Sequence, residues 1–109
     1  MTVGRMAEAL SLESISVPEV EREINGVYIG DLLSWVMGRA ESGNAWITIM
    51  SNINIVAVAS LADVACVVLA EGVTLADDGR TTAEQKGINV YSSSKTAYEL
   101  AVALADLLK

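Results

Sequence analysis

Residues 26–72 read GVYIGDLLSWVMGRAESGNAWITIMSNINIVAVASLADVACVVLAEG. In this stretch, apolar runs of strand length alternate with longer apolar segments of helix length. The expected elements are a strand over residues 26–29, a helix over 32–40, a strand over 45–49, a helix over 54–63 and a strand over 65–69. Strands that alternate with helices at this spacing predict a mostly parallel sheet covered by helices.

The segment before this stretch adds one helix and one strand. The helix is predicted by apolar residues at helical spacing, with Thr2 as its N-cap: Val3, Met6, Ala7 and Leu10. Residues 14–17 alternate serine with apolar side chains and predict a short strand, which Pro18 confines to a sheet edge or terminates.

The segment after residue 72 is polar and rich in turn residues. Asp78-Gly79 is its strongest turn signal, and only a weak helix is predicted over residues 82–86. A last strand over residues 88–91 precedes the closing helix, which Thr96 and Glu99 begin with a capping box. The fold class expected is therefore a single α/β domain over residues 1–109, with about five short strands flanked by helices.

Composition agrees with one compact domain whose core is built from small aliphatic residues. Of the 109 residues, 52% are apolar and only 5% aromatic, with no Phe, so Val, Ile, Leu and Ala must fill the core. Trp46 lies within an apolar strand and is expected to be buried. The apolar excess suggests that some of these residues lie in a subunit interface.

Charge and hydropathy exclude two kinds of partner. The net charge of -7, from 14 acidic and 7 basic residues, repels phosphate backbones, so we expect no nucleic-acid partner. Residues 1–5 lack an apolar signal region, and no stretch approaches the roughly 20 apolar residues that span a bilayer. We expect a cytoplasmic protein with no membrane partner.

The residues needed for common catalytic and metal sites are missing. Without His and with a single Cys66, the chain cannot form a Ser-His or Cys-His pair or a His/Cys metal site. Asp77 and Asp78 are interpreted as solvated turn residues rather than metal ligands. We therefore expect no enzyme activity, no metal and no cofactor.

A phosphate-binding P-loop is also excluded. Residues 92–96 read SSSKT between a predicted strand and a predicted helix, but Asn89 and Ser94 occupy the positions where the P-loop requires glycine. These residues are interpreted as a turn whose hydroxyls cap the helix, although the amides at a helix N-terminus next to Lys95 also attract small anions.

Parallel sheets bind ligands beyond the carboxyl ends of their strands, and this rule selects the candidate binding residues. They are polar or small and follow the predicted strands: Asp31, Ser51, Asn52, Glu71, Gly72, Ser92, Ser93 and Lys95. If these loops converge, they form a shallow cleft for a small polar ligand. The alternative, which the sequence favours, is that they are ordinary caps and turns, with Asp31 as the cap of the helix over residues 32–40.

Four strings in the chain carry a resemblance to a known family: GDLLSWVMGRA at 30–40, AWITI at 45–49, NIVAVA at 54–59 and LAEG at 69–72. They resemble small stand-alone bacterial proteins of the DRTGG-domain family over nearly the whole chain. DRTGG domains are similar to the N-terminal domain of HPr serine kinase/phosphorylase and, more distantly, to those of Mur ligases. The Asp-Arg-Thr-Gly-Gly string itself is absent, and Ala70-Glu71-Gly72 stands where the family has Thr-Gly-Gly.

The resemblance implies a non-catalytic regulatory or protein-interaction module that self-associates. A homodimer is expected, with Trp35 and Met37 of the apolar helix as interface candidates, because aromatic residues and Met are enriched at interfaces. Two alternatives stay open: a sensor of a small polar or anionic ligand at the strand ends, and an accessory subunit that docks on a separately encoded enzyme.

Overall fold

The computed structural model describes residues 1–109, which fold around a five-stranded sheet with the strand order β1-β5-β4-β3-β2. The strands are β1 (Glu13–Ser16), β2 (Gly26–Ile29), β3 (Asn44–Thr48), β4 (Cys66–Leu69) and β5 (Val90–Ser92). Strands β2, β3, β4 and β5 are parallel, and β1 pairs antiparallel with β5 at one edge. The mostly parallel sheet predicted from residues 26–72 is confirmed.

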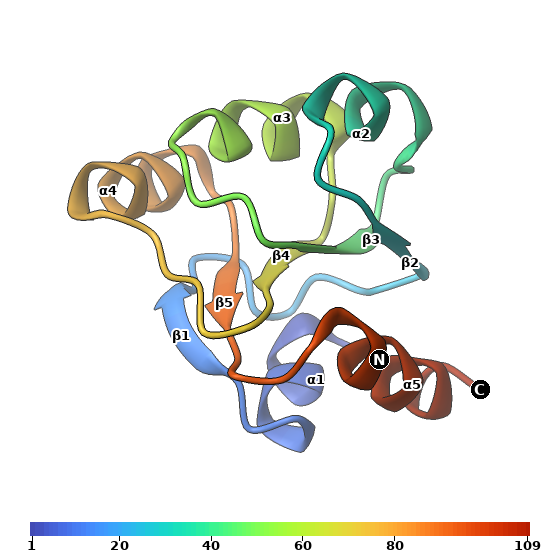
Figure 1. The fold of residues 1–109 in the computed structure, drawn as a ribbon. Helices are drawn as coiled ribbons and strands as arrows, with labels where there is room; N and C mark the ends of the chain where they lie inside the picture. Colours follow the sequence, from blue (N-terminus) through green and yellow to red (C-terminus); the bar gives the residue numbers. More distant parts are fainter.

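Helices cover both faces of this sheet (Figure 1). They are α1 (Val3–Ala9), α2 (Leu33–Arg39), α3 (Asn54–Ala62), α4 (Asp77–Lys86) and α5 (Ala97–Leu107). Helices α2, α3 and α4 connect successive parallel strands and lie on one face, as expected when all such connections share one hand. Helices α1 and α5 lie on the other face.

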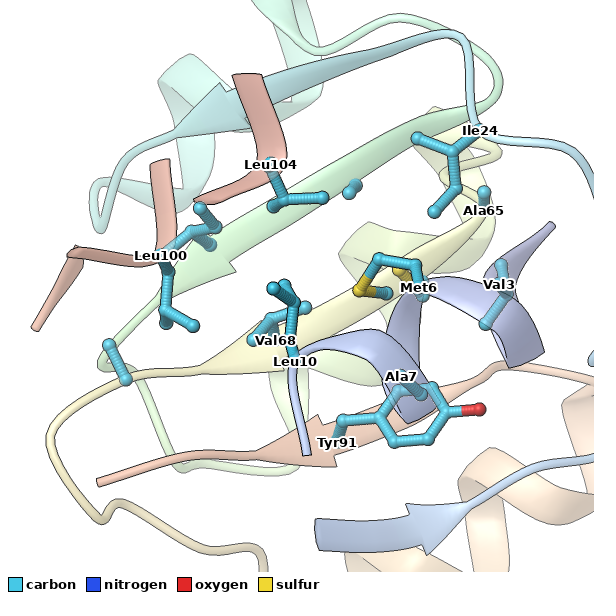
Figure 2. Packing of buried hydrophobic residues seen from close by; sticks show 14 residues of the cluster. Val3, Met6, Ala7, Leu10, Ile24, Ala65, Val68, Tyr91, Leu100 and Leu104 are labelled. Atoms are coloured by element: carbon cyan, nitrogen blue, oxygen red, sulfur yellow. The ribbon is translucent and has the colours of Figure 1, made fainter. Parts of the chain in front are cut away.

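A hydrophobic cluster fills the space between each helical layer and the sheet. On the α1 and α5 face, Met6, Leu100 and Leu104 pack with Val68 and Tyr91 of the sheet (Figure 2). Small strand residues such as Ala45 and Cys66 let the helices approach closely, which is how a domain without Phe reaches a dense core.

Trp46 is the largest side chain of the opposite cluster and has no exposed surface, as predicted. Its indole Nε1 donates a hydrogen bond of 2.9 Å to the carbonyl oxygen of Gly30. The ring therefore fills the core while its polar atom fixes the loop that follows β2.

Helix α4 differs from the prediction, because it begins at Asp77 rather than near residue 82. The turn predicted at Asp78-Gly79 is wrong. Gly79 is buried within the helix, and a Cβ at this position would lie 2.7 Å from Cγ of Leu75. Glycine serves here for close packing. Asp77 and Asp78 occupy the first turn, where the helix dipole favours carboxylates.

Strand β1 lies at the sheet edge, as predicted, but its alternation is interrupted. The pairing with β5 shifts between Ser14 and Ser16. Ser16 is consequently buried and donates a hydrogen bond of 2.8 Å to the carbonyl oxygen of Ile88, whereas Val17 is exposed.

The N-caps predicted at Thr2 and Thr96 form. The Thr2 hydroxyl accepts a bond of 3.3 Å from the Arg5 amide. Thr96 and Glu99 form the capping box of α5, in which the Thr96 amide donates to Glu99 Oε1 at 3.1 Å. That backbone hydrogen bond lowers the pKa of Glu99. None of the helices combines the length and apolar character that crossing a membrane requires.

Asp63 joins three segments that are distant in sequence. It ends α3 in a left-handed conformation with φ of 57°. Its Oδ1 accepts from Arg22 Nη1 at 2.9 Å, and its Oδ2 accepts from the Ser42 hydroxyl at 2.5 Å. These hydrogen bonds lower the pKa of Asp63.

Candidate functional site

The loops that follow the four parallel strands lie at one edge of the sheet, because parallel strands end on the same side. All eight sequence-predicted binding residues are in these loops or at the end of β5. The structure divides them into two groups.

The first group belongs to the loops after β2 and β3. Oδ1 of Asp31 accepts hydrogen bonds from the Thr48 hydroxyl at 2.8 Å and from the Ile49 amide at 3.0 Å. Asp31 therefore ties the two loops together. The prediction that Asp31 caps α2 is wrong. The N-cap residue is Leu32, and no side chain forms a capping hydrogen bond there.

Ser51 and Asn52 lie in the loop between β3 and α3 and are exposed. Asn52 Oδ1 accepts a hydrogen bond of 2.6 Å from the Asn54 amide, so its side chain supports the local turn into α3. This agrees with the capping role that the sequence favoured for such residues.

The second group belongs to the loops after β4 and β5, whose backbones pair directly. The Glu71 amide donates to the Lys95 carbonyl oxygen, and the Gly72 amide donates to that of Ser93, both at 2.8 Å. The Ser92 hydroxyl donates to the carbonyl oxygen of Val73 at 2.7 Å. The structure thus brings Glu71, Gly72 and residues 92–95 together.

Glu71 and Gly72 both adopt left-handed backbone conformations, with φ of 59° and 75°. Glycine adopts such conformations without strain, whereas a residue with a Cβ does so at a cost. Gly72 therefore adopts its conformation without strain, whereas Glu71 does so at a cost.

Two adjoining hollows open at this second group of loops. One has a volume of about 280 Å³ and the other about 440 Å³. They share Glu13, Ser92 and Ser94. The smaller one is also lined by Gly72 and Arg80, among others.

The larger hollow reaches the remaining residues of the second group, Ser93 and Lys95. Asp31, Ser51, Asn52 and Glu71 line neither hollow. The two hollows lie around β5 and the loop after β4, and the loops after β2 and β3 contribute no lining residue.

Sequence reasoning missed several residues that line these hollows, chiefly Glu13, Thr74 and Arg80. Glu13 reaches this edge because β1 is antiparallel to β5, so that Glu13 pairs with Ser92. Arg80 was not predicted as a lining residue, because the turn predicted at Asp78-Gly79 placed it outside any helix. Arg80 could have been found only by extending the predicted helix over residues 82–86 upstream through Gly79.

The hollows combine hydroxyl groups with charges of both signs. The Arg80 guanidinium forms an exposed ion pair of 3.5 Å with Asp77, whereas Lys95 and Glu13 have no ion-pair partner. Such a surface suits a small, strongly polar ligand that uses hydroxyl donors and one or two cations.

Cys66 lies far from this chemistry, in the middle of the α1 and α5 cluster. It is completely buried, and burial raises the pKa of its thiol to about 12. A thiol in this state packs as a small apolar side chain. No group of three or more His, Cys, Asp or Glu side chains is arranged to hold a metal ion.

A comparison with protein-family models gives no match, and neither does one with curated proteins. Among solved structures, the chain is similar to the CBS and DRTGG domains of the regulatory region of Clostridium perfringens pyrophosphatase, complexed with the activator diadenosine tetraphosphate. The TM-score is 0.74 at 14% sequence identity, over 94% of this chain and 45% of that chain.

This likeness spans less than half of the neighbouring chain and, at 14% identity, concerns the fold. It does not bear on the similarity to HPr serine kinase/phosphorylase that the sequence implied. The chain therefore shares its fold with part of a regulatory region built from CBS and DRTGG domains, in agreement with the DRTGG resemblance of its sequence.

Proposed function

We propose that this chain is a non-catalytic regulatory module that self-associates as a homodimer through the outer face of α2. The fold it shares with part of a pyrophosphatase regulatory region supports a regulatory role. The observation that carries the proposal is the exposure of Trp35 and Met37, which are 52% and 48% accessible on a short surface helix.

These two side chains flank a strip of small residues. At 3.6 residues per turn, Ser34 and Gly38 lie on the side of α2 opposite Val36, the one buried residue of the helix, and Trp35 and Met37 lie on either flank. A Cβ at Gly38 would meet no atom within 4 Å. Small residues between large apolar ones let a second helix approach closely, and a two-fold axis pairs such a face with itself.

The Arg39 guanidinium lies over the Trp35 ring at 3.8 Å from its centroid. This cation–π contact holds the ring in one position at the surface. A pre-positioned aromatic side chain loses less conformational freedom on association than a free one.

Sedimentation velocity or light scattering tests this proposal. We expect a dimer at tens of micromolar, and a monomer with unchanged secondary structure for Met37→Asp, because the dimer would bury an unpaired charge. Gly38→Gln should have the same effect by blocking close approach, since the monomer has room for this side chain. The matched control is Tyr98→Asp on α5, which should remain dimeric.

A wild type that is monomeric at these concentrations would overturn the proposal. Dissociation by Tyr98→Asp, with Met37→Asp and Gly38→Gln unaffected, would move the interface to α5. If Met37→Asp unfolds the chain, Gly38→Gln still tests the interface, because it changes the same face of α2 without replacing an apolar side chain.

A second candidate function rests on the hollows beside β5. The structural neighbour was solved with a polyanionic activator, and here Arg80 and Lys95 line adjoining hollows together with the hydroxyls of Ser92 and Ser94. The chain would then sense a small anion. Calorimetric titration with diadenosine tetraphosphate tests this candidate: binding should weaken at least tenfold in Lys95→Ala and stay unchanged in Lys86→Ala.

Absence of catalysis is part of the proposal. Cys66 is buried and protonated, and the hollows contain no general base next to a nucleophile. We expect no nucleotide hydrolysis and no phosphorylation of a seryl protein. Turnover that disappears in Lys95→Ala, with the fold retained, would contradict this part of the proposal.

A further inference from the structure

The largest hollow of the molecule lies on the α1 side of the sheet, away from the outer face of α2. It has a volume of about 690 Å³ and is bounded by α1, β1 and residues 17–21. It shares only Ser11 and Ser14 with the hollows beside β5. Pockets that hold small molecules have volumes of about 300–1,000 Å³.

The walls of this hollow are held by backbone hydrogen bonds. The Gly4 amide donates to the Val20 carbonyl oxygen at 2.9 Å, and the Val3 amide donates to that of Arg22 at 2.8 Å. A Cβ at Gly4 would lie 3.3 Å from Cβ of Val20, so glycine allows α1 and the opposite wall to meet. The hollow is therefore formed before any ligand arrives.

Tyr91 lines the hollow with an unpartnered polar group. Its side chain is only 2% exposed, and its ring belongs to the cluster under α1. Figure 2 shows the hydroxyl at the end of the ring that points away from Leu10 and Val68. No protein atom forms a hydrogen bond with this hydroxyl. The hydroxyl oxygen itself is not among the buried atoms, so it reaches the space of the hollow and is free to bond a ligand there.

Two further properties define what the hollow can hold. Its apolar wall comes from Leu12, Val17 and Val20, and its rim carries Arg5, Glu8 and Glu21, none of which is in an ion pair. Two carboxylates against one guanidinium disfavour an anion. Burial raises the pKa of Tyr91, so its hydroxyl is protonated at neutral pH and available as donor and acceptor.

We propose that this hollow is a binding site for a neutral or cationic small molecule that has an apolar ring-sized body and one polar group hydrogen-bonded to the Tyr91 hydroxyl. The apolar wall accepts the body, the tyrosine fixes its orientation, and the acidic rim selects against anions. The site is independent of α2, so its failure would leave the dimer proposal intact, and failure of the dimer would leave this site intact.

Three probes of the same shape and different charge test this proposal: benzamide, benzamidine and benzoate. Each is titrated into the ¹⁵N-labelled protein at millimolar concentrations, and amide shifts are followed by NMR. We expect saturable shifts at Gly4, Arg5, Ser14 and Val20, with benzamidine and benzamide binding more tightly than benzoate.

Variants then assign the interactions. Tyr91→Phe keeps the ring in the cluster and removes the hydroxyl, so benzamide should bind about fivefold more weakly, as expected for one lost hydrogen bond. Tyr98→Phe makes the same change at an exposed position of α5 and should bind as the wild type does. Glu21→Gln should reduce the preference for benzamidine over benzoate.

The contrary results are equally specific. Shifts confined to other surfaces, or none at millimolar concentration, would show that the hollow does not select this class of molecule. Benzoate binding as tightly as benzamidine would overturn the charge argument. Unchanged benzamide affinity in Tyr91→Phe, with the spectrum otherwise native, would remove the tyrosine from the site.

Discussion

Trp46 combines complete burial with a satisfied polar atom, and both contribute to stability. Trp46→Ala should lower the free energy of unfolding by about 3–5 kcal/mol, because it leaves a large cavity beside β3. The change in the free energy of unfolding is measured by urea denaturation. Both chains also carry Gly38→Gln, which is expected to keep them monomeric, so that association does not contribute. The matched control is Trp35→Ala on exposed α2, for which the loss should stay below about 1 kcal/mol. A loss below about 1 kcal/mol for Trp46→Ala would contradict the packing described.

Glu71 has a left-handed backbone conformation, with φ of 59°, which lowers the free energy of unfolding. Its side chain is exposed and makes no hydrogen bond, and its amide bond to the Lys95 carbonyl survives substitution. Glu71→Gly should therefore raise the free energy of unfolding by about 1 kcal/mol. Glu84→Gly, within α4, should lower it by up to about 1 kcal/mol. Two changes of equal sign in chemical denaturation would refute the conformational argument.

At the scale of elements, Asp63 links the end of α3 to the segments before β2 and β3 through Arg22 and Ser42. Its pKa in the folded chain lies below the value of 3.8 for the unfolded chain. The hydrogen bonds of Asp63 therefore stabilise the fold fully at pH values above 3.8. This stabilisation is lost as the pH falls through the pKa of Asp63 in the folded chain.

Asp63→Asn keeps a residue that tolerates the left-handed backbone but removes the charge. The variant should be less stable than the wild type at pH 7, and the difference should shrink as pH falls through the folded-state pKa of Asp63. Denaturant midpoints across this pH range measure the effect. Asp106→Asn, in an exposed ion pair with Lys109, is the control and should change the midpoint little at any pH. A difference that is the same at pH 2 and pH 7 would assign the effect to shape and not to charge.

Most elements could be predicted because their signals are local. The capping box at Thr96, the buried strand around Trp46 and the helix over residues 54–63 each depend on neighbours within a few residues in the chain. Helix α4 could not be placed correctly, because the contact that explains Gly79 comes from the packing of Leu75 against it.

The residues of the candidate site likewise divide into those that local sequence signals identify and those that depend on tertiary contacts. Gly72, Ser92, Ser93 and Lys95 could be chosen because the carboxyl-end rule needs only the strand order along the sequence. Glu13 could not, because its place beside Ser92 depends on β1 pairing with a strand that follows it by more than seventy residues. The sequence identifies Tyr91 only as a strand residue, because the absence of a hydrogen-bond partner for its hydroxyl depends on three-dimensional packing.

At the scale of the whole molecule, two chains of net charge -7 must approach each other to form the proposed dimer. The contact itself is apolar, so charge opposes it only through long-range repulsion. Salt screens this repulsion, with a Debye length of about 10 Å at 0.1 M.

The dimer dissociation constant should therefore fall several-fold when sodium chloride is raised from low to physiological ionic strength, as measured by sedimentation velocity. Met37→Asp should stay monomeric throughout and serves as the control. Weaker association at higher salt would mean that ion pairs, and not the α2 face, hold the dimer.

The position of α5 also sets the order in which the fold is completed during synthesis. Leu100 and Leu104 close the cluster over β3 and β2, yet they follow every strand in the chain. Until α5 has left the ribosome and docked, Ile47 and Val27 of the sheet lack the cover that this helix provides. Apolar surface that is exposed in this interval favours chaperone binding and misassembly of the nascent chain.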